Sequence, residues 1–270
     1  MRLNAPASSS RPETTVIQND GIFIQYWRIH MQIKQDFLVR MEDTGKGFRL
    51  SNKGMLTMLT NLACLHGNRS GQGPMDREAC HLSWMVVGWR LLVDHRPLLS
   101  QMVHGVTWAS GYGRLQTTRD FLLYDEQDRL AAKATSSWLV LDEHNARVLR
   151  MTPEIVEPSG PETDKQTFPG CTFPREAPAF EPERTVTVRV TRTMIDCNDH
   201  VHNVAYMDLF NEALPEDEDM DRFSDLTLVY RREIRPRQLV TAVYGRTDEA
   251  RIVLLKETDT DVVHAFLILK

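Results

Sequence analysis

Residues 51–66 read SNKGMLTMLTNLACLH, and Gly67 follows them directly. The apolar side chains of this stretch recur at helical spacing, and a glycine commonly ends a helix. The spacing therefore predicts a half-buried helix from Ser51 to His66, with one apolar stripe turned toward a core. That stripe consists of Met55, Met58, Leu59 and Leu62, followed by Leu65 or His66.

The segments that follow this helix have the composition of strands. They are rich in Val, Leu, Thr and aromatic residues, and Asp, Glu, Gly and Pro separate them. The intervals between them are too short for crossover helices, which disfavours a doubly wound parallel sheet and favours an antiparallel one. The predicted strands are Trp84–Val93, Met102–Gly111, Arg114–Asp125 and Leu130–Asp142.

Seven prolines stand between Pro153 and Pro182, where the periodicity of the preceding segments is lost. Such a composition is typical of a linker. Beyond it the order of the first half returns, with a helix from about Asn203 to Leu214 that Pro215 ends. The strands predicted in this second half are Arg184–Val190, Leu226–Glu233, Leu239–Arg246, Arg251–Glu257 and Val262–Leu269.

Two copies of one long helix against one antiparallel sheet indicate an internal duplication in the order of the elements, without a residue-level repeat. The fold class that follows is α+β, with two similar domains. A length of 270 residues suits two domains of ordinary size. The predicted organisation is a flexible tail at 1–15, an N-terminal domain at 16–152, a Pro-rich linker at 153–183 and a C-terminal domain at 184–270.

The composition excludes several classes of protein. With 41% hydrophobic and 26% charged residues, the chain is neither collagen-like nor wholly disordered. Its apolar runs are far shorter than the roughly 20 residues of a membrane span. A formal net charge of -5 gives no general reason to bind nucleic acid. Four widely spaced cysteines and the lack of a secretory signal predict a cytoplasmic protein without a disulfide framework or a structural zinc site.

The most informative polar stretch is Asp196-Cys197-Asn198-Asp199-His200, between a predicted strand and the second predicted helix. An asparagine amide both donates and accepts hydrogen bonds, a histidine titrates near neutral pH, and Asp196 can orient either Asn198 or His200. The helix N-terminus that follows offers unpaired N–H groups for a developing oxyanion. A stretch rich in Asp and Asn before a helix is equally typical of a simple N-cap, so spacing alone leaves both interpretations open.

A second polar stretch, YRREIR, covers residues 230–235 on the strand predicted after the second helix. Its acid, Glu233, could meet His200 in space. In strand alternation, however, Glu233 shares a face with Arg231 and Arg235, where it would equally be a solvated ion-pair partner. The residue types alone favour that second interpretation.

The two stretches resemble those of the acyl-acyl carrier protein (acyl-ACP) thioesterase family, in its bacterial type. Asp196-x-Asn198-x-His200-Val201-x-Asn203-x-x-Tyr206 is similar to the family's D-x-N-x-H-V-N-N-x-x-Y stretch, and 230–233 is similar to its Y-R-R-E stretch. Similar stretches in the first half are Asn61-Leu62-Ala63-x-x-His66, Gly71-x-Gly73, Trp84, Thr107-Trp108, Arg119-Asp120-Phe121 and 134–142. The resemblance implies two tandem hotdog domains, each a long helix wrapped by an antiparallel sheet.

The resemblance also implies an activity, which is hydrolysis of an acyl thioester on its carrier protein to end fatty-acid synthesis. The N-terminal domain would bind the acyl chain and the C-terminal domain would carry the catalysis. No cofactor or metal is implied, because the substrate brings its own phosphopantetheine. The tunnel for the acyl chain would be lined by Met55, Met58, Leu59 and Leu62, although an apolar helical stripe is more often ordinary core.

Position by position, the resemblance implies a catalytic set of Asp196, Asn198, His200 and Glu233. Glu233 would act as the general base for water. Asn198 and His200 would fix that water and the thioester, and Asp196 would orient one of them. N–H groups at the start of the second helix would stabilise the oxyanion.

The chain departs from the family pattern at two positions. Ile234 stands where plant members carry a cysteine, which excludes a cysteine nucleophile there and favours attack by water. His202 stands where the family usually has the first Asn of its N-N pair, and it would either alter the hydrogen bonds around His200 or point into solvent.

Two other chemistries are weaker alternatives for this site. Cys197 could be a nucleophile, but strand alternation predicts that it faces the core if Asp196 and Asn198 face the cleft. A metal held by His200, His202 and Asp196 lacks a supporting cluster elsewhere in the sequence. Neither is preferred to attack by water.

Alternative functions on the same fold are an acyl-CoA thioesterase, a hydratase or dehydratase of acyl thioesters, and a non-catalytic acyl-binding protein. A regulator of this last kind would be expected to carry an output module, for which we find no segment.

An acyl carrier protein is acidic, so its docking needs exposed cations on this chain. The arginines that could provide them would equally be solvated residues on strand faces. A monomer and a homodimer are both consistent with two domains that pair internally. The candidate docking residues are Arg189, Arg192, Arg231, Arg232, Arg235 and Arg237.

Overall fold

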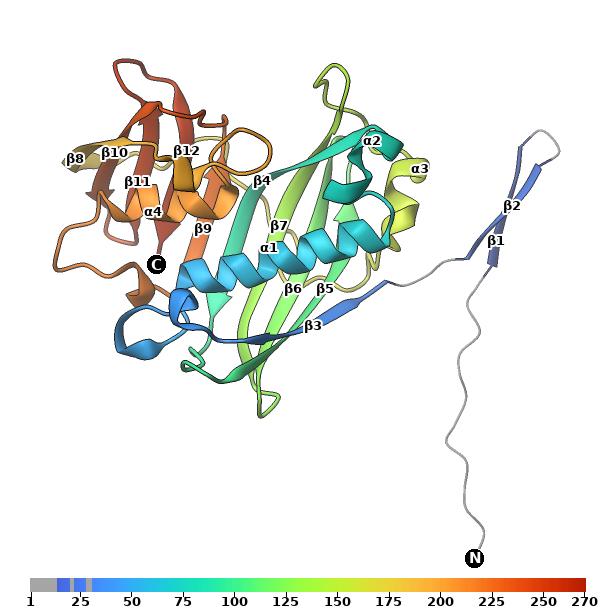
Figure 1. The fold of residues 1–270 in the computed structure, drawn as a ribbon, viewed down its shortest axis with the longest axis horizontal. Coiled ribbons are helices and arrows are strands. Elements are labelled where there is room, and N and C mark those ends of the chain that lie inside the picture. Colours follow the sequence, from blue (N-terminus) through green and yellow to red (C-terminus); the bar gives the residue numbers. More distant parts are fainter. Residues whose placement is uncertain (1–13, 20–21, 28–30) are drawn as a thin grey trace, which may run out of the picture.

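The computed structural model describes residues 14–19, 22–27 and 31–270 (Figure 1). Strands β1 (Thr14–Asn19) and β2 (Ile22–Trp27) form a two-stranded antiparallel sheet. Of the tail predicted at 1–15, residues 1–13 lie outside the described residues. Thr14 and Thr15 belong to β1 instead of to a tail.

The remaining strands form one antiparallel sheet that both halves of the chain share. Its order is β3-β5-β6-β7-β4-β9-β12-β11-β10-β8. The strands of the first half are β3 (Ile33–Leu38), β4 (Leu82–Val93), β5 (Met102–Tyr112), β6 (Gln116–Asp125) and β7 (Leu130–Asp142). Those of the second half are β8 (Glu181–Arg189), β9 (Asp225–Tyr230), β10 (Leu239–Arg246), β11 (Arg251–Glu257) and β12 (Val263–Leu269).

The two halves have the same topology. From the outer edge to the centre, each half places the strand before its helix, then the second, third and fourth strands after the helix, and finally the first. The first strands after the helices, β4 and β9, pair with each other at the centre of the sheet. The duplication predicted from the order of the elements is therefore present, and the two halves are joined by a continuous hydrogen-bonded ladder.

Helix α1 (Asn52–Arg69) lies across the strands of the first half (Figure 1). It begins at Ser51, whose hydroxyl accepts a hydrogen bond of 2.9 Å from Gly54 N, as an N-cap residue does. The helix packs so closely on β5 that a Cβ atom at Gly105 would lie 2.6 Å from Leu62 Cδ1. The helix predicted from Ser51 to His66 is thus confirmed, with Ser51 as its N-cap and its end about one turn later, at Arg69.

The second helix is shorter than predicted. A 3₁₀ turn spans Asn203–Ala205, and α4 spans only Tyr206–Asn211. After Glu212 the backbone N–H groups bond three residues back instead of four, since Ala213 N donates to Phe210 O at 3.2 Å and Leu214 N donates to Asn211 O at 3.1 Å. Because the residue before a proline avoids helical geometry, Pro215 prevents the helix from continuing past Leu214. The apolar stripe continues to Leu214, but the regular helix does not.

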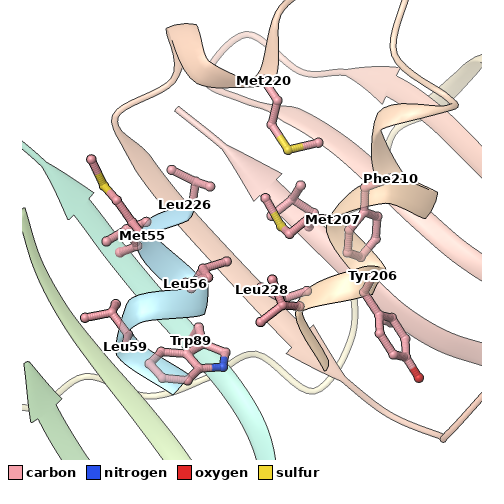
Figure 2. Packing of buried hydrophobic residues seen from close by; sticks show 14 of the residues in the cluster. Met55, Leu56, Leu59, Trp89, Tyr206, Met207, Phe210, Met220, Leu226 and Leu228 are labelled. Atoms are coloured by element: carbon pink, nitrogen blue, oxygen red, sulfur yellow. The ribbon is translucent and has the colours of Figure 1, made fainter. Parts of the chain in front are cut away.

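One hydrophobic core crosses the junction of the two halves. Figure 2 shows Met55 and Leu59 of α1 and Trp89 of β4 beside Leu228 of β9 and Phe210 of α4. The helices are also linked directly, because Lys53 Nζ lies 2.7 Å from Asp208 Oδ1. The two halves therefore do not have separate cores.

The segment between the halves crosses the opposite face of the sheet. It contains the short helix α3 (Pro153–Val156) and little other regular structure before β8. The ring of Phe168 lies under the guanidinium of Arg90, 5.1 Å away. Phe173 fills the space over Gly88, where a Cβ atom would lie 2.6 Å from its ring. No helix in the described part of the chain is long and apolar enough to cross a membrane.

Candidate active site

The stretch from Asp196 to His200 is a tight turn between β8 and the second helix. Asp196 N donates to His200 O at 3.0 Å, and Asp199 adopts a positive φ of 59°. The Asp196 carboxylate accepts a 2.8 Å hydrogen bond from Asn198 N, and its Oδ1 lies 3.5 Å from His200 Nδ1. Three of the four predicted catalytic side chains are thus in one turn, with Asp196 between the other two.

The fourth predicted residue lies on a segment that leaves the sheet. Strand β9 ends at Tyr230, because Arg231 N and Arg232 N both donate to the single carbonyl of His264, at 2.8 and 3.1 Å. The prediction of a strand running to Glu233 is therefore wrong at its C-terminal end. Residues 231–234 instead turn toward the 196–203 stretch.

Hydrogen bonds hold these two stretches side by side. Val201 N donates to Ile234 O at 2.8 Å, and Ile234 N donates to the Tyr206 hydroxyl at 3.1 Å. The Tyr230 hydroxyl donates to Asn203 O at 2.7 Å. Figure 2 shows the Tyr206 ring beside the core, with its hydroxyl directed away from the apolar cluster. Tyr206 of the first polar stretch and Tyr230 of the second therefore form the junction between the two stretches.

Glu233 is next to this junction but does not contact His200 in the structure. Its Oε1 accepts hydrogen bonds of 2.9 and 2.6 Å from Arg235, and its side chain is 47% exposed. Burial, together with the charges of Glu233 and Asp196, holds the pKa of Tyr206 above its ordinary value. Glu233 and Asp196 are thus close enough to the Tyr206 hydroxyl for their charges to add to the effect of burial on its pKa.

Removing the Tyr206 hydroxyl tests this junction. In Tyr206→Phe the buried N–H of Ile234 loses its acceptor, so we expect the free energy of unfolding to fall by about 1–3 kcal/mol. Urea denaturation followed by circular dichroism measures the loss. Tyr112→Phe is the control, because Tyr112 is 57% exposed and should change stability by less than about 0.5 kcal/mol. An unchanged midpoint for Tyr206→Phe would contradict the role of this hydroxyl.

Two N–H groups at the start of the second helix are already paired within the chain. Val204 N donates to the Asn203 side chain and Ala205 N donates to His202 O, each at 2.8 Å. N–H groups that are already paired are poor donors for a substrate. The side chains of the turn are therefore the better candidates.

Two further expectations concern Cys197 and His202. Cys197 is exposed and does not face the core, because residues 196–200 form a turn to which strand alternation does not apply. Burial lowers the pKa of His202, which is only partly exposed. Among the described residues there is no group of three His, Cys, Asp or Glu side chains arranged to hold a metal ion.

The other predicted residues occupy two environments. The candidate tunnel residues are at most 3% exposed and belong to the core under α1, so their role in binding an acyl chain stays a prediction. The candidate docking arginines are all exposed around the two joined stretches. The tunnel residues are Met55, Met58, Leu59 and Leu62, and the arginines are Arg189, Arg192, Arg231, Arg232, Arg235 and Arg237.

Sequence reasoning missed one residue of the first half that reaches the turn, and the glutamate that holds it. Arg77, at the start of α2 (Arg77–Cys80), donates from Nη1 to Asn198 Oδ1. It is also paired with Glu143, at distances down to 2.6 Å. No periodicity or motif marks a contact between an arginine and side chains 66 and 121 residues away.

His66, which belongs to the first-half resemblance, is a buried neutral histidine. Its Nδ1 accepts a hydrogen bond of 3.0 Å from Arg119 Nη2, and its Nε2 lies 3.1 Å from Met31 O. An acceptor at Nδ1 and a donor at Nε2 define the neutral ring. Burial lowers the pKa of His66 to about 3, and burial lowers the pKa of Arg119 to about 10. These contacts tie α1 to β6 inside the first half.

The sequence is similar to known protein families and to individual proteins of established name. Models of the acyl-ACP thioesterase N-terminal domain and C-terminal domain match residues 30–159 and 179–265. Oleoyl-acyl carrier protein thioesterase 2 of Arabidopsis thaliana, a chloroplastic protein, is 25% identical over 226 residues, which cover 78% of this chain and 62% of the relative. Palmitoyl-acyl carrier protein thioesterase of Gossypium hirsutum is 26% identical over 224 residues, covering 74% and 51%. The matched part is thus less than two thirds of either relative.

Solved structures show the same fold. An acyl-ACP thioesterase from Bacteroides thetaiotaomicron superposes with a TM-score of 0.76 at 17% identity, covering 88% of this chain and 96% of the other. The 12:0-ACP thioesterase from Umbellularia californica gives 0.73 at 16% identity, with the same coverage. These likenesses confirm the predicted tandem hotdog fold. With family models matching nearly all of both halves, the chain belongs to the acyl-ACP thioesterase family.

Proposed function

We propose that this protein hydrolyses the thioester of an acyl-acyl carrier protein, releasing a fatty acid and the holo-carrier. The observation that carries the proposal is the junction through Tyr206 and Ile234, which joins the turn of Asp196, Asn198 and His200 to the segment of Glu233. A carboxylate base and amide and imidazole groups in one place suit attack of water on a carbonyl.

In the proposed reaction Glu233 is the general base. The Arg235 side chain donates both of its hydrogen bonds to Glu233 Oε1, which leaves Oε2 to accept a proton from water. The water oxygen bonds to the thioester carbon while the carbonyl π electrons move to oxygen. The carbonyl then re-forms as the C–S bond breaks, its electron pair goes to sulfur, and Glu233 releases its proton to the thiolate or to solvent. The leaving thiolate of phosphopantetheine departs readily with or without a proton, so a strong general acid is not required.

The turn supplies the remaining groups. Asp196 lies 3.5 Å from both the Asn198 amide nitrogen and His200 Nδ1, which orients the amide and the imidazole. We propose that Asn198 and His200 hold the water and the thioester oxygen between them. The domain roles follow: the half at 16–152 holds the acyl chain and the half at 184–270 carries the base. The Pro-rich segment at 153–183 links them.

The proposed setting is fatty-acid synthesis in the cytoplasm. All four cysteines are free, which agrees with a reducing compartment. The acidic carrier is then the partner, and the fatty-acyl chain is the group released. Acyl-CoA hydrolysis, hydration chemistry and acyl binding without catalysis are the competing functions.

Release of free thiol from matched acyl-acyl carrier proteins and acyl-CoAs separates these functions. We expect fast release from the carrier-bound substrates and weak release from acyl-CoAs of the same chain length. Release from acyl-CoA alone would replace the proposal by an acyl-CoA thioesterase. Absence of release from either class by a folded protein would overturn the hydrolase and leave hydration or binding.

Carrier docking is tested by reversing charge beside the site. Arg231 and Arg232 are exposed, and the double variant Arg231→Glu/Arg232→Glu would repel an acidic carrier. We expect KM for the acyl-acyl carrier protein to rise about tenfold at low salt, which corresponds to about 1.4 kcal/mol. KM for an uncharged acyl thioester of N-acetylcysteamine should change far less.

The matched control is Arg114→Glu, an exposed arginine of the first half. It should leave the KM for both substrates close to that of the wild type. High salt should reduce the difference between the double variant and the wild type, because screening weakens exposed charges. Equal rises in KM for the carrier-bound and the uncharged substrate would contradict docking at these arginines.

A further inference from the structure

Arg77 connects the first half of the chain to the candidate active site. It is the first residue of α2, and its Nη1 donates to the side-chain oxygen of Asn198. This oxygen belongs to one of the proposed catalytic residues, which lies in the other half. A hydrogen bond from a charged donor to a neutral amide oxygen is stronger than one between two neutral groups.

Arg77 is itself held in place by Glu143. Its Nε donates to Oε2 at 3.0 Å, and its Nη2 donates to Oε1 at 2.6 Å and to Oε2 at 2.8 Å. Both side chains are about one third exposed. A two-pronged pair of this kind fixes the plane of the guanidinium. The Arg77 Nη1 group therefore has a defined direction before any substrate binds.

The backbone around Glu143 is anchored to the end of α2. Glu143 N donates to His81 O at 3.0 Å, and the rings of His81 and His144 lie 4.5 Å apart. Helix α2 and the turn after β7 thus form one support. Arg77 projects from that support toward the turn of the second half.

The contact decides which way the Asn198 amide points. Its Oδ1 accepts from Arg77, and its Nδ2 lies 3.5 Å from Asp196 Oδ2. An amide nitrogen carries two hydrogens, so one N–H remains after the contact with Asp196. Withdrawal of electron density by Arg77 makes this remaining N–H a better donor.

We propose that Arg77, held by Glu143, is a positioning residue that makes Asn198 a hydrogen-bond donor to the thioester oxygen. This inference rests on the proposed function. Arg77 itself acts through Asn198 and need not touch the substrate. Both halves of the chain then contribute to the active site. The first half orients the Asn198 amide through Arg77, and the second half carries Asn198 and the base, Glu233.

The first experiment separates kcat from KM. Arg77→Met keeps the apolar stem and removes the donor, and we expect kcat with acyl-acyl carrier protein to fall about tenfold to a hundredfold. KM and the melting temperature should stay close to the wild-type values, and Arg77→Lys should recover part of kcat. Arg69→Met, at the exposed end of α1, is the matched control and should be unchanged.

A double-mutant cycle gives the decisive result. If Arg77 acts through Asn198, Arg77→Met should cause no further loss of kcat in an Asn198→Ala protein. An equal loss in both backgrounds, or an increase in KM alone, would overturn the proposal and assign Arg77 to direct substrate binding. If Asn198→Ala leaves no measurable rate, an unchanged kcat in Arg77→Met overturns the inference and a reduced kcat with Arg77→Lys rescue supports it. A wild-type protein without thiol release would instead refute the proposed function.

Discussion

Replacing Glu233 by Gln is expected to lower kcat for thiol release by about a hundredfold to ten-thousandfold, which is the usual contribution of a general base. The amide has the shape of the carboxylate and can still accept a hydrogen bond from Arg235, but it cannot take a proton from water. KM should change little, because the variant keeps the local contacts. Steady-state kinetics with an acyl-acyl carrier protein measure both constants.

The matched control for this variant is Glu183→Gln. Glu183 is also an exposed glutamate paired with an arginine, since its Oε1 lies 2.9 Å from Arg246 Nε. It lies on β8 and has no place in the proposed reaction, so kcat should not change. If Glu233→Gln keeps kcat within about threefold of the wild type, the base is another group, and His200→Ala becomes the next variant to measure.

Trp89→Ala is expected to reduce the free energy of unfolding by about 3–5 kcal/mol, as large-to-small changes of buried aromatic residues do. Trp89 is 1% exposed and packs against Phe121 and Trp138, with ring centroids 5.1 and 6.3 Å away. Its backbone pairs with Leu228 of β9 in the central ladder. The loss should therefore reach both halves at once.

Urea denaturation followed by circular dichroism, together with hydrogen exchange measured by mass spectrometry, tests this expectation. Peptides from β6 and from β11 should lose protection in one common transition. Met85→Ala, on the same strand but 42% exposed, is the control and should cost less than about 1 kcal/mol. Two separate transitions, or a loss below about 1 kcal/mol for Trp89→Ala, would contradict a shared core.

The sequence predicted best those elements whose signals are local. Strands β7, β10 and β11 have the predicted bounds, because segments rich in Val, Leu, Ala and Thr are bounded by turn residues at both ends. The end of β9 and the length of α4 were predicted less well. At the end of β9, the Tyr206 hydroxyl and two bonds to one carbonyl of His264 redirect the backbone, and such contacts between distant residues leave no period in the sequence.

The candidate site divides in the same way. Asp196, Asn198 and His200 are neighbours in sequence, so their proximity in the turn follows from the stretch itself. The exposure of Cys197 was missed, because alternation was applied to residues that form a turn around Asp199. The contribution of Arg77 depends on how the two halves pair, and no property of the residue alone reveals it.

Strand β8, at one edge of the large sheet, affects how readily the protein aggregates at high concentration. An unpaired sheet edge is a template on which another chain can add a strand and begin an aggregate. Strand β8 is one of the two edges of the large sheet, and Glu181, Pro182, Glu183 and Arg189 are exposed along it. Proline offers no N–H group to an incoming strand, and charges of both signs must be desolvated before one can pair. Growth of cross-β fibrils from this edge is therefore disfavoured.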